Sequence, residues 1–209
     1  MREASIMFQA SPKFMSFEEF VEWYPDRAGR YELYRGAIVE MLPTGDHEEV
    51  TAFTTGELFL EVRRLQLPYI IPRTYLVKPP GEDSGYQPDI LVLDRVALQD
   101  EPRWKKSSTI ERGESIKLAV EVVSTNWNTD YGNKVTDYER MGIPEYWIVD
   151  FRGLGAKRYI GSPKQPTISV YQLIEGEYQV QQFRGKDRVI SDTFPELALT
   201  AEQIFAAGV

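Results

Sequence analysis

Two nearly continuous apolar runs constrain the fold of this chain more than any other feature of its sequence. The runs occupy residues 117–124 and 144–150, and their composition is typical of β-strands that are buried on both faces of a sheet. A segment with helical spacing of apolar residues separates them. One charged residue, Glu121, stands inside the first run, where a carboxylate is out of place.

The remaining pattern surrounds these runs with short strands, two hairpins and one long helix. Apolar spacing predicts the long helix from Asp46, its expected N-cap, to Leu65. The polar stretch at 94–114 is typical of a loop. The other predicted elements are helices at 17–24, 129–141 and 201–207, the second capped by Thr129 or Asp130, hairpins at 31–42 and 168–183, and strands at 69–78, 86–93 and 189–190.

This order of elements indicates an α/β or α+β fold around a mixed central β-sheet flanked by helices. A chain of 209 residues is long enough for one domain of ordinary size. We therefore expect a single domain over residues 1–209. Its core would occupy about 30–152, and a C-terminal β extension with a short helix would occupy 153–209.

Composition excludes several kinds of site. The chain has no cysteine and one histidine, His47, which excludes disulfide frameworks, zinc–thiolate centres, cysteine nucleophiles and histidine-rich metal sites. Its net charge of −8 argues against a broad basic surface, although a local basic groove beside a metal remains possible. No apolar stretch approaches the roughly 18 residues that a membrane span needs. We expect a cytoplasmic protein that does not enter a membrane.

Two carboxylates and one lysine are the candidate chemical groups. Asp89 heads a predicted apolar strand, and Glu121 lies inside the next long one. Buried carboxylates must be paired, hydrogen-bonded, protonated or bound to metal. Two carboxylates side by side offer a metal ion only oxygen ligands, and this donor set favours the binding of Mg²⁺ or Mn²⁺. Lys134 lies on the inward stripe of the following predicted helix and could reach back over the end of the Glu121 strand.

Each of these residues also has a structural interpretation. Asp89 could cap a turn, Glu121 could pair with a structural Arg or Lys, and Lys134 could extend its ammonium into water. His47 is interpreted as a locally satisfied residue at a helix start rather than as a catalytic base. An arginine partner on either carboxylate would count against the catalytic interpretation.

The same residues stand in a pattern that resembles a known family. Pro88-Asp89, the segment 121–124, Asp130 with Lys134 and Tyr138, and the segment 142–150 are similar to the Uma family of putative restriction endonucleases, a bacterial group placed in the PD-(D/E)XK nuclease superfamily. The segments 31–36, 43–47 and 194–197 also resemble that family. The resemblance covers roughly residues 16–205.

The resemblance implies a restriction-endonuclease-like core and metal-dependent phosphodiester hydrolysis. It implies that Asp89, Glu121 and the backbone carbonyl of Val122 bind Mg²⁺ or Mn²⁺, and that Lys134 completes the catalytic set. The lysine of the superfamily motif would stand two residues after Glu121, where this sequence has Val123. Lys134 matches an alternative position in the following helix. The possible accessory residues are Glu32 and Tyr138.

Three functional hypotheses follow. The first is a Mg²⁺-dependent endonuclease acting on DNA, expected to be a homodimer because two active sites cut the two strands of a duplex. The second is a nuclease fold that serves as a non-catalytic binding or regulatory module, which the Val123 departure and the acidic composition motivate. The third is a phosphodiesterase acting on small nucleotides.

Overall fold

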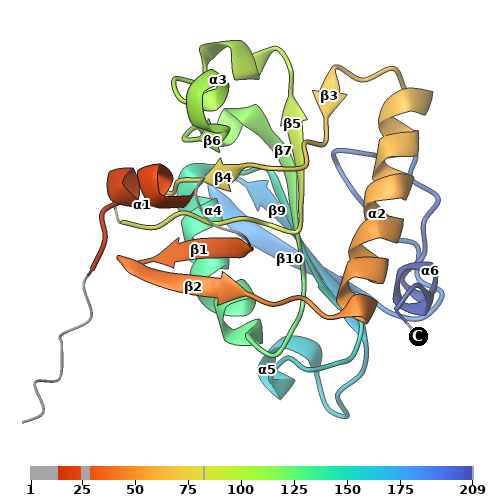
Figure 1. Ribbon diagram of the computed structural model, residues 1–209. Helices are drawn as coiled ribbons and strands as arrows, with labels where there is room; N and C mark the ends of the chain where they lie inside the picture. The colour runs from red at the N-terminus through yellow and green to blue at the C-terminus, as the bar shows by residue number, and fades with distance from the viewer. Residues whose placement is uncertain (1–13, 25–28, 82, 209) are drawn as a thin grey trace, which may run out of the picture.

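A six-stranded mixed β-sheet forms the centre of the computed structural model, which describes residues 14–24, 29–81 and 83–208 (Figure 1). The strand order is β10-β9-β8-β7-β5-β3. Only β7 and β8 run parallel, and the other neighbours are antiparallel. The strands are β3 (Tyr69–Ile70), β5 (Ile90–Asp94), β7 (Ile116–Val122), β8 (Glu145–Asp150), β9 (Thr167–Ile174) and β10 (Glu177–Phe183). The predicted mixed sheet with flanking helices is therefore confirmed.

The two apolar runs form the adjacent strands β7 and β8 in the middle of this sheet. All six residues of β8 are buried, and in β7 only Lys117 is not. Buried on both faces, these strands need an apolar layer above and below. Gly142 ends the intervening helix in the left-handed conformation, with φ 79°.

Helices cover the two faces of the sheet (Figure 1). On one face, α2 and α6 pack with Trp147 of β8 in one core cluster. On the other face, Tyr138 of α4 packs with Tyr146 and Ile148 in a second cluster. The α-helices are α1 (Phe17–Trp23), α2 (Gly45–Arg64), α3 (Trp104–Ser107), α4 (Val135–Met141), α5 (Lys157–Ile160) and α6 (Ala201–Ala206).

A π-helical segment, η4 (Thr129–Lys134), precedes α4 directly. Its N-cap is Asn128, which makes no side-chain capping hydrogen bond, so the predicted cap at Thr129 or Asp130 is wrong. Asp130 and Lys134 instead form an ion pair one turn apart. Single π turns inside helices are frequent at functional sites.

Two small sheets complete the structure. The hairpin of β1 (Arg30–Tyr34) and β2 (Ala37–Met41) lies beside the central sheet, and β4 (Leu76–Val77) pairs with β6 (Thr109–Ile110). Among the described residues, no helix is long and apolar enough to cross a membrane.

Several predicted boundaries are corrected by the structure. The N-cap of α2 is Thr44, whose hydroxyl accepts from the His47 amide, and not Asp46. The predicted 69–78 strand divides into β3 and β4, with Pro72, which has no N–H to donate, between them. Residues 189–190 form no strand. The expected loop at 94–114 contains α3, β6 and two 3₁₀ turns, η2 (Ala97–Asp100) and η3 (Gly113–Ser115).

Candidate active site

Asp89 and Glu121 are brought together by the pairing of β5 with β7. Ile90 lies opposite Val120 in this antiparallel pair, so the residue before Ile90 faces the residue after Val120. Both carboxylates line one cavity of about 80 Å³. The main-chain N–H of Val122 donates to Oδ2 of Asp89 at 2.8 Å, which ties the head of β5 to the end of β7.

Lys134 reaches this cavity from η4. Its Nζ lies 2.9 Å from Oε1 of Glu121, 3.1 Å from Oε1 of Glu32 and 3.4 Å from Oδ1 of Asp130. The Lys134 side chain is 1% exposed. The interpretation that its ammonium extends into water is therefore wrong, because the amine is enclosed by three carboxylates. Pairing of Glu121 with a structural lysine, however, remains compatible with this geometry.

The two accessory residues also lie in this cluster. Glu32, from β1, accepts a hydrogen bond from the main-chain N–H of Gln87 at 2.8 Å in addition to its ion pair with Lys134. The hydroxyl of Tyr138, from α4, donates to Oε1 of Glu121 at 3.3 Å. Both donors to Glu121, Lys134 and Tyr138, thus reach the same oxygen atom.

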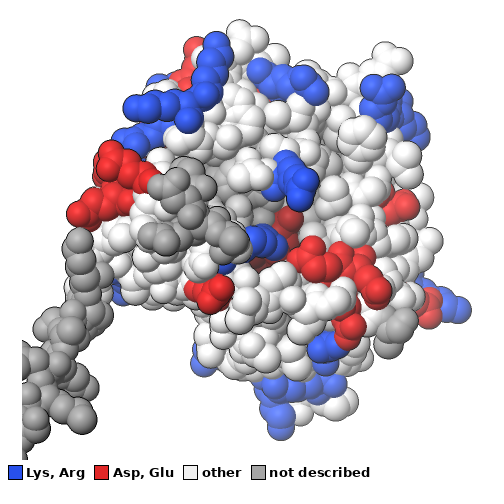
Figure 2. All heavy atoms as spheres, viewed as in Figure 1, with Lys and Arg blue, Asp and Glu red and all other residues white. Residues whose placement is uncertain are grey.

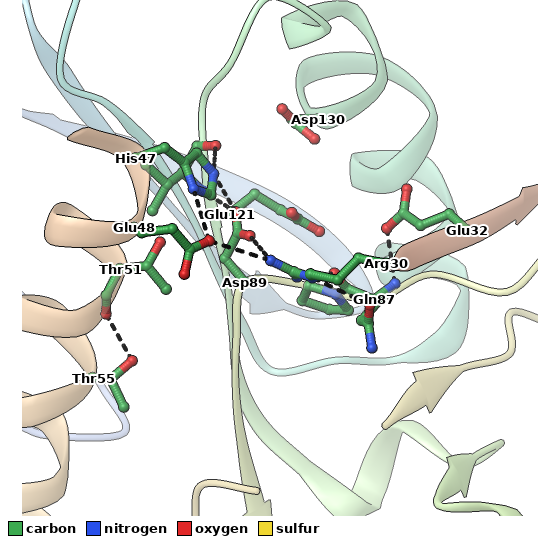
Figure 3. A network of polar contacts seen from close by, with 12 residues as sticks. Arg30, Glu32, His47, Glu48, Thr51, Thr55, Gln87, Asp89, Glu121 and Asp130 are labelled. Atoms are coloured by element: carbon green, nitrogen blue, oxygen red, sulfur yellow. Dashed lines mark hydrogen bonds and ion pairs between the residues drawn. The ribbon is translucent and has the colours of Figure 1, made fainter. Parts of the chain in front are cut away.

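Asp89 has two side-chain partners that the sequence did not indicate (Figure 3). Nε2 of His47 lies 3.1 Å from Oδ2, and the guanidinium of Arg30 lies 3.2 Å from Oδ1. The Arg30 contact is the arginine pairing that counts against a catalytic interpretation of Asp89. It occupies Oδ1, whereas Oδ2 faces His47 and the end of β7.

The structure corrects the interpretation of His47 as a locally satisfied residue. Its ring is 7% exposed, and Nε2 lies 3.0 Å from the carbonyl oxygen of Val122 as well as close to Asp89. A signal for this was present in the sequence. His47 stands at helical spacing with Val50, Thr54 and Leu58, which form the buried stripe of α2.

Arg30 and Asp130 are the other site residues that the sequence prediction left out. Asp130 precedes Lys134 by one helical turn, so an ion pair between them could have been inferred. Arg30 begins a hairpin strand of a separate sheet, and no pattern in the sequence connects it with Asp89.

Burial and neighbouring charges shift the pKa values of the residues in this cluster. Burial raises the pKa of Glu121 well above its usual range, although Lys134 opposes this shift. Burial likewise raises the pKa of Asp130 to about 7. The pKa of Lys134 is raised well above its usual value because the attraction of Glu121, Glu32 and Asp130 exceeds the effect of burial.

The pKa values of Asp89 and His47 shift in the directions that favour a negatively charged Asp89 and a positively charged His47. Burial would raise the pKa of Asp89, but its hydrogen bond with His47 and the charges of His47 and Arg30 lower it overall. Burial opposes protonation of His47, but the contact with Asp89 and the charge of Glu48 raise its pKa.

Two larger clefts meet at Asp89. One of about 270 Å³ is lined by His47, Ser124 and Asn126, and one of about 940 Å³ is lined by Arg73, Tyr75 and Lys106. Arg30 lines both of them. Figure 2 shows a hollow on this face, with acidic side chains at its floor and both basic and acidic side chains at its margin. The carboxylates are therefore buried but lie beside clefts that solvent can enter.

The donor atoms fit a divalent cation only when the main chain is included. Among the described residues, no three His, Asp or Glu side chains converge tightly enough to enclose a metal ion. Asp89 Oδ2 and the Val122 carbonyl do converge, because both lie within 3.1 Å of one atom, His47 Nε2. These are oxygen ligands of the type that Mg²⁺ and Mn²⁺ prefer.

The charge balance also fits a cation. Four carboxylates line the 80 Å³ cavity, namely Glu32, Asp89, Glu121 and Asp130. They face two permanent cations, Lys134 and Arg30, so full ionisation leaves an excess of two negative charges, or of one when His47 is protonated. Without a metal, protons must relieve this excess, and the neighbouring carboxylates add to burial, the main cause, in raising the pKa values of Glu121 and Asp130.

Comparisons with known proteins agree with this architecture. A search of curated proteins found no match. The chain is similar to the crystal structure of a putative nuclease belonging to DUF820 from Anabaena variabilis ATCC 29413, with a TM-score of 0.71 and 16% sequence identity over 93% of this chain and 99% of that one. At this identity the likeness establishes the fold alone. The model of the Uma2 family, described as putative restriction endonuclease, matches residues 17–202, and the chain therefore belongs to that family.

Proposed function

We propose that this protein is a Mg²⁺- or Mn²⁺-dependent endonuclease that hydrolyses phosphodiester bonds of DNA. The observation that carries the proposal is the excess of negative charge in the cavity that Asp89 and Glu121 share. Burying like charges side by side is unfavourable, and a divalent cation removes that cost. Membership in a family of putative restriction endonucleases supports the nuclease class.

The proposed ligands are Asp89, Glu121 and the carbonyl oxygen of Val122. A bound divalent cation would lower the pKa of a coordinated water molecule and neutralise charge on the scissile phosphate. Lys134 would supply a fixed positive charge next to Glu121, which can orient the attacking water or stabilise the phosphate as charge develops on it. Tyr138 and Glu32 would hold Glu121 and Lys134 in place.

Arg30 would contribute to phosphate binding. Its side chain is 30% exposed and lines both clefts, so its guanidinium can exchange the carboxylate of Asp89 for a phosphate oxygen. Along the larger cleft, Arg73 and Lys106 are exposed and form no ion pair with any described residue. These cations offer a polyanion a local path to Asp89 despite the net charge of −8.

The test is cleavage of supercoiled plasmid DNA by purified protein with Mg²⁺ or Mn²⁺, and with EDTA as the metal-free control. Asp89→Asn and Glu121→Gln should each abolish cleavage. Asp94→Asn is a matched control, because Asp94 lies at the opposite end of β5 and should leave activity unchanged. Cleavage that survives both active-site substitutions would disprove the assignment.

The substrate class and the assembly need their own measurements. RNA, short oligonucleotides and cyclic nucleotides assayed beside plasmid DNA would separate an endonuclease from a small-nucleotide phosphodiesterase. A homodimer would supply two active sites for the two strands of a duplex, and sedimentation equilibrium would establish the assembly. We further propose that the protein works in the cytoplasm.

The Arg30–Asp89 ion pair favours a second candidate function, a nuclease fold that binds without cleaving. In that case the arginine would neutralise Asp89 permanently, and the fold would act as a binding or regulatory module. Binding of DNA or a protein partner, with no cleavage and no calorimetric signal for Mg²⁺ or Mn²⁺, would support this alternative.

A further inference from the structure

The single histidine of the chain contacts two of the three proposed ligands of the cation. Nε2 of His47 lies 3.1 Å from Oδ2 of Asp89 and 3.0 Å from the carbonyl oxygen of Val122. The imidazole comes from α2, whereas the two oxygen atoms belong to the head of β5 and the end of β7. Three separate elements therefore present one nitrogen and two oxygen atoms to a common point.

The spacing of these atoms is that of neighbouring ligands on one metal ion. Ligand bonds of about 2.1 Å in octahedral geometry place adjacent donor atoms about 3.0 Å apart. The two distances measured from His47 Nε2 match this value. Hydrogen bonds have similar lengths, so distance alone does not separate the two roles, and the other ring nitrogen supplies a second observation.

Nδ1 of His47 is buried and has no hydrogen-bond partner among the residues that the structure describes. The nearest carboxylate oxygen with which it is paired, Oε1 of Glu48, lies 3.7 Å away, just beyond hydrogen-bond length (Figure 3). A histidine that binds a metal through one nitrogen usually donates the N–H of the other to a carboxylate or carbonyl. A small movement of Glu48, which is 55% exposed, would complete this arrangement.

We propose that His47 Nε2 is a direct ligand of the catalytic cation and that the site accordingly binds Mn²⁺ in preference to Mg²⁺. The inference rests on the proposed function, because it concerns the same cation. Imidazole binds first-row transition metals well, whereas Mg²⁺ strongly prefers oxygen. Coordination requires the tautomer with its proton on Nδ1, and Glu48 is placed to accept that proton in a hydrogen bond.

The experiment is pulsed electron paramagnetic resonance of Mn²⁺ bound to the tag-free protein. Because the chain contains one histidine, any histidine nitrogen coupled to the metal belongs to His47. We expect ¹⁴N modulation in unlabelled protein and its replacement by ¹⁵N coupling after labelling with ¹⁵N-histidine. This test needs no substitution that could disturb folding.

Affinities provide a second readout. We expect calorimetry to show that His47→Gln weakens Mn²⁺ binding roughly tenfold or more while changing Mg²⁺ binding much less. Glu48→Gln should weaken Mn²⁺ binding and retain the nitrogen coupling. Bound Mn²⁺ that Asp89→Asn removes but that shows no histidine coupling would overturn this inference and leave the proposed metal site intact. Absence of any Mn²⁺ binding would overturn both.

Discussion

The ammonium of Lys134 lies 2.9 Å from Oε1 of Glu121, and both side chains are almost fully buried. Glu32 and Asp130 complete the surroundings of the same ammonium. One positive charge therefore holds three carboxylates inside the protein. Removing the charge of Lys134 should therefore lower the free energy of unfolding, and this effect is separate from any role of Lys134 in catalysis.

Replacing Lys134 with methionine should destabilise the metal-free protein by about 3–5 kcal/mol, because it leaves buried carboxylates without their counter-charge. The measurement is the free energy of unfolding from urea denaturation. Lys106→Met is the control, since Lys106 is exposed and forms no ion pair with the described residues, and it should change stability by less than about 0.5 kcal/mol. Equal effects of the two substitutions would contradict the prediction.

The stability of the metal-free protein should fall as pH rises from about 4 to about 7. Burial raises the pKa of Asp130 to about 7 in the folded protein, whereas an unfolded aspartate titrates near 4. Between these values the folded state keeps a proton that the unfolded state has lost, so this stabilisation is present at low pH and is lost through pH 7. One such group contributes a slope of at most about 1.4 kcal/mol per pH unit.

Asp130→Asn tests the origin of that slope. The substitution removes the titrating group, so urea unfolding at a series of pH values between 4 and 8 should show a shallower decline than the unsubstituted protein. Asp187→Asn serves as the control, because Asp187 is exposed. An unchanged slope in the Asp130 variant would show that other groups cause the pH dependence.

Glu145 links the central sheet to the C-terminal segment. It is 1% exposed and accepts hydrogen bonds from Nε1 of Trp147 at 2.6 Å and from the main-chain N–H of Thr193 at 2.8 Å. Glu145→Ala leaves both donors unpaired and should cost about 2–4 kcal/mol of stability. Thermal unfolding followed by tryptophan fluorescence is the measurement. Glu177→Ala, at an exposed position of β10, should have little effect.

Two glycines should respond to alanine in opposite directions. At Gly113 a Cβ atom would lie 2.1 Å from the carbonyl oxygen of Met141, so Gly113→Ala should destabilise the protein by about 1–3 kcal/mol or more. At Gly56, inside α2, a Cβ atom meets nothing within 4 Å. Gly56→Ala should stabilise the protein by about 0.5–1 kcal/mol through helix propensity. Differential scanning calorimetry of both variants is the measurement. Melting temperatures that change in the same direction for the two variants would contradict the prediction.

The positions of Asp89 and Glu121 relative to the strands were predictable because they depend on local pattern, although the predicted 86–93 strand begins only at Ile90 and Asp89 directly precedes it. A carboxylate inside an apolar run must be accommodated wherever that run is buried, so Glu121 was identifiable as a special residue from its neighbours alone. The inward placement of Lys134 was predictable for a similar reason, since helical periodicity orders side chains around one axis. Their catalytic roles remain a proposal.

The partners of Asp89 were not predictable in the same way. His47 stands 42 residues before Asp89 and 75 before Val122. Arg30 belongs to a hairpin outside the central sheet. Neither contact follows from spacing along the chain, because each depends on how one element docks against another.

By itself, the sequence determined which segments become buried strands and helices and which polar residues fall among them, because hydrophobic periodicity acts over a few neighbouring residues. Only the tertiary structure decided that Asp89 faces both an arginine and a histidine and that one lysine is enclosed by three carboxylates. Such contacts arise when elements distant in sequence pack together, and the charge balance of a buried site is fixed at that stage.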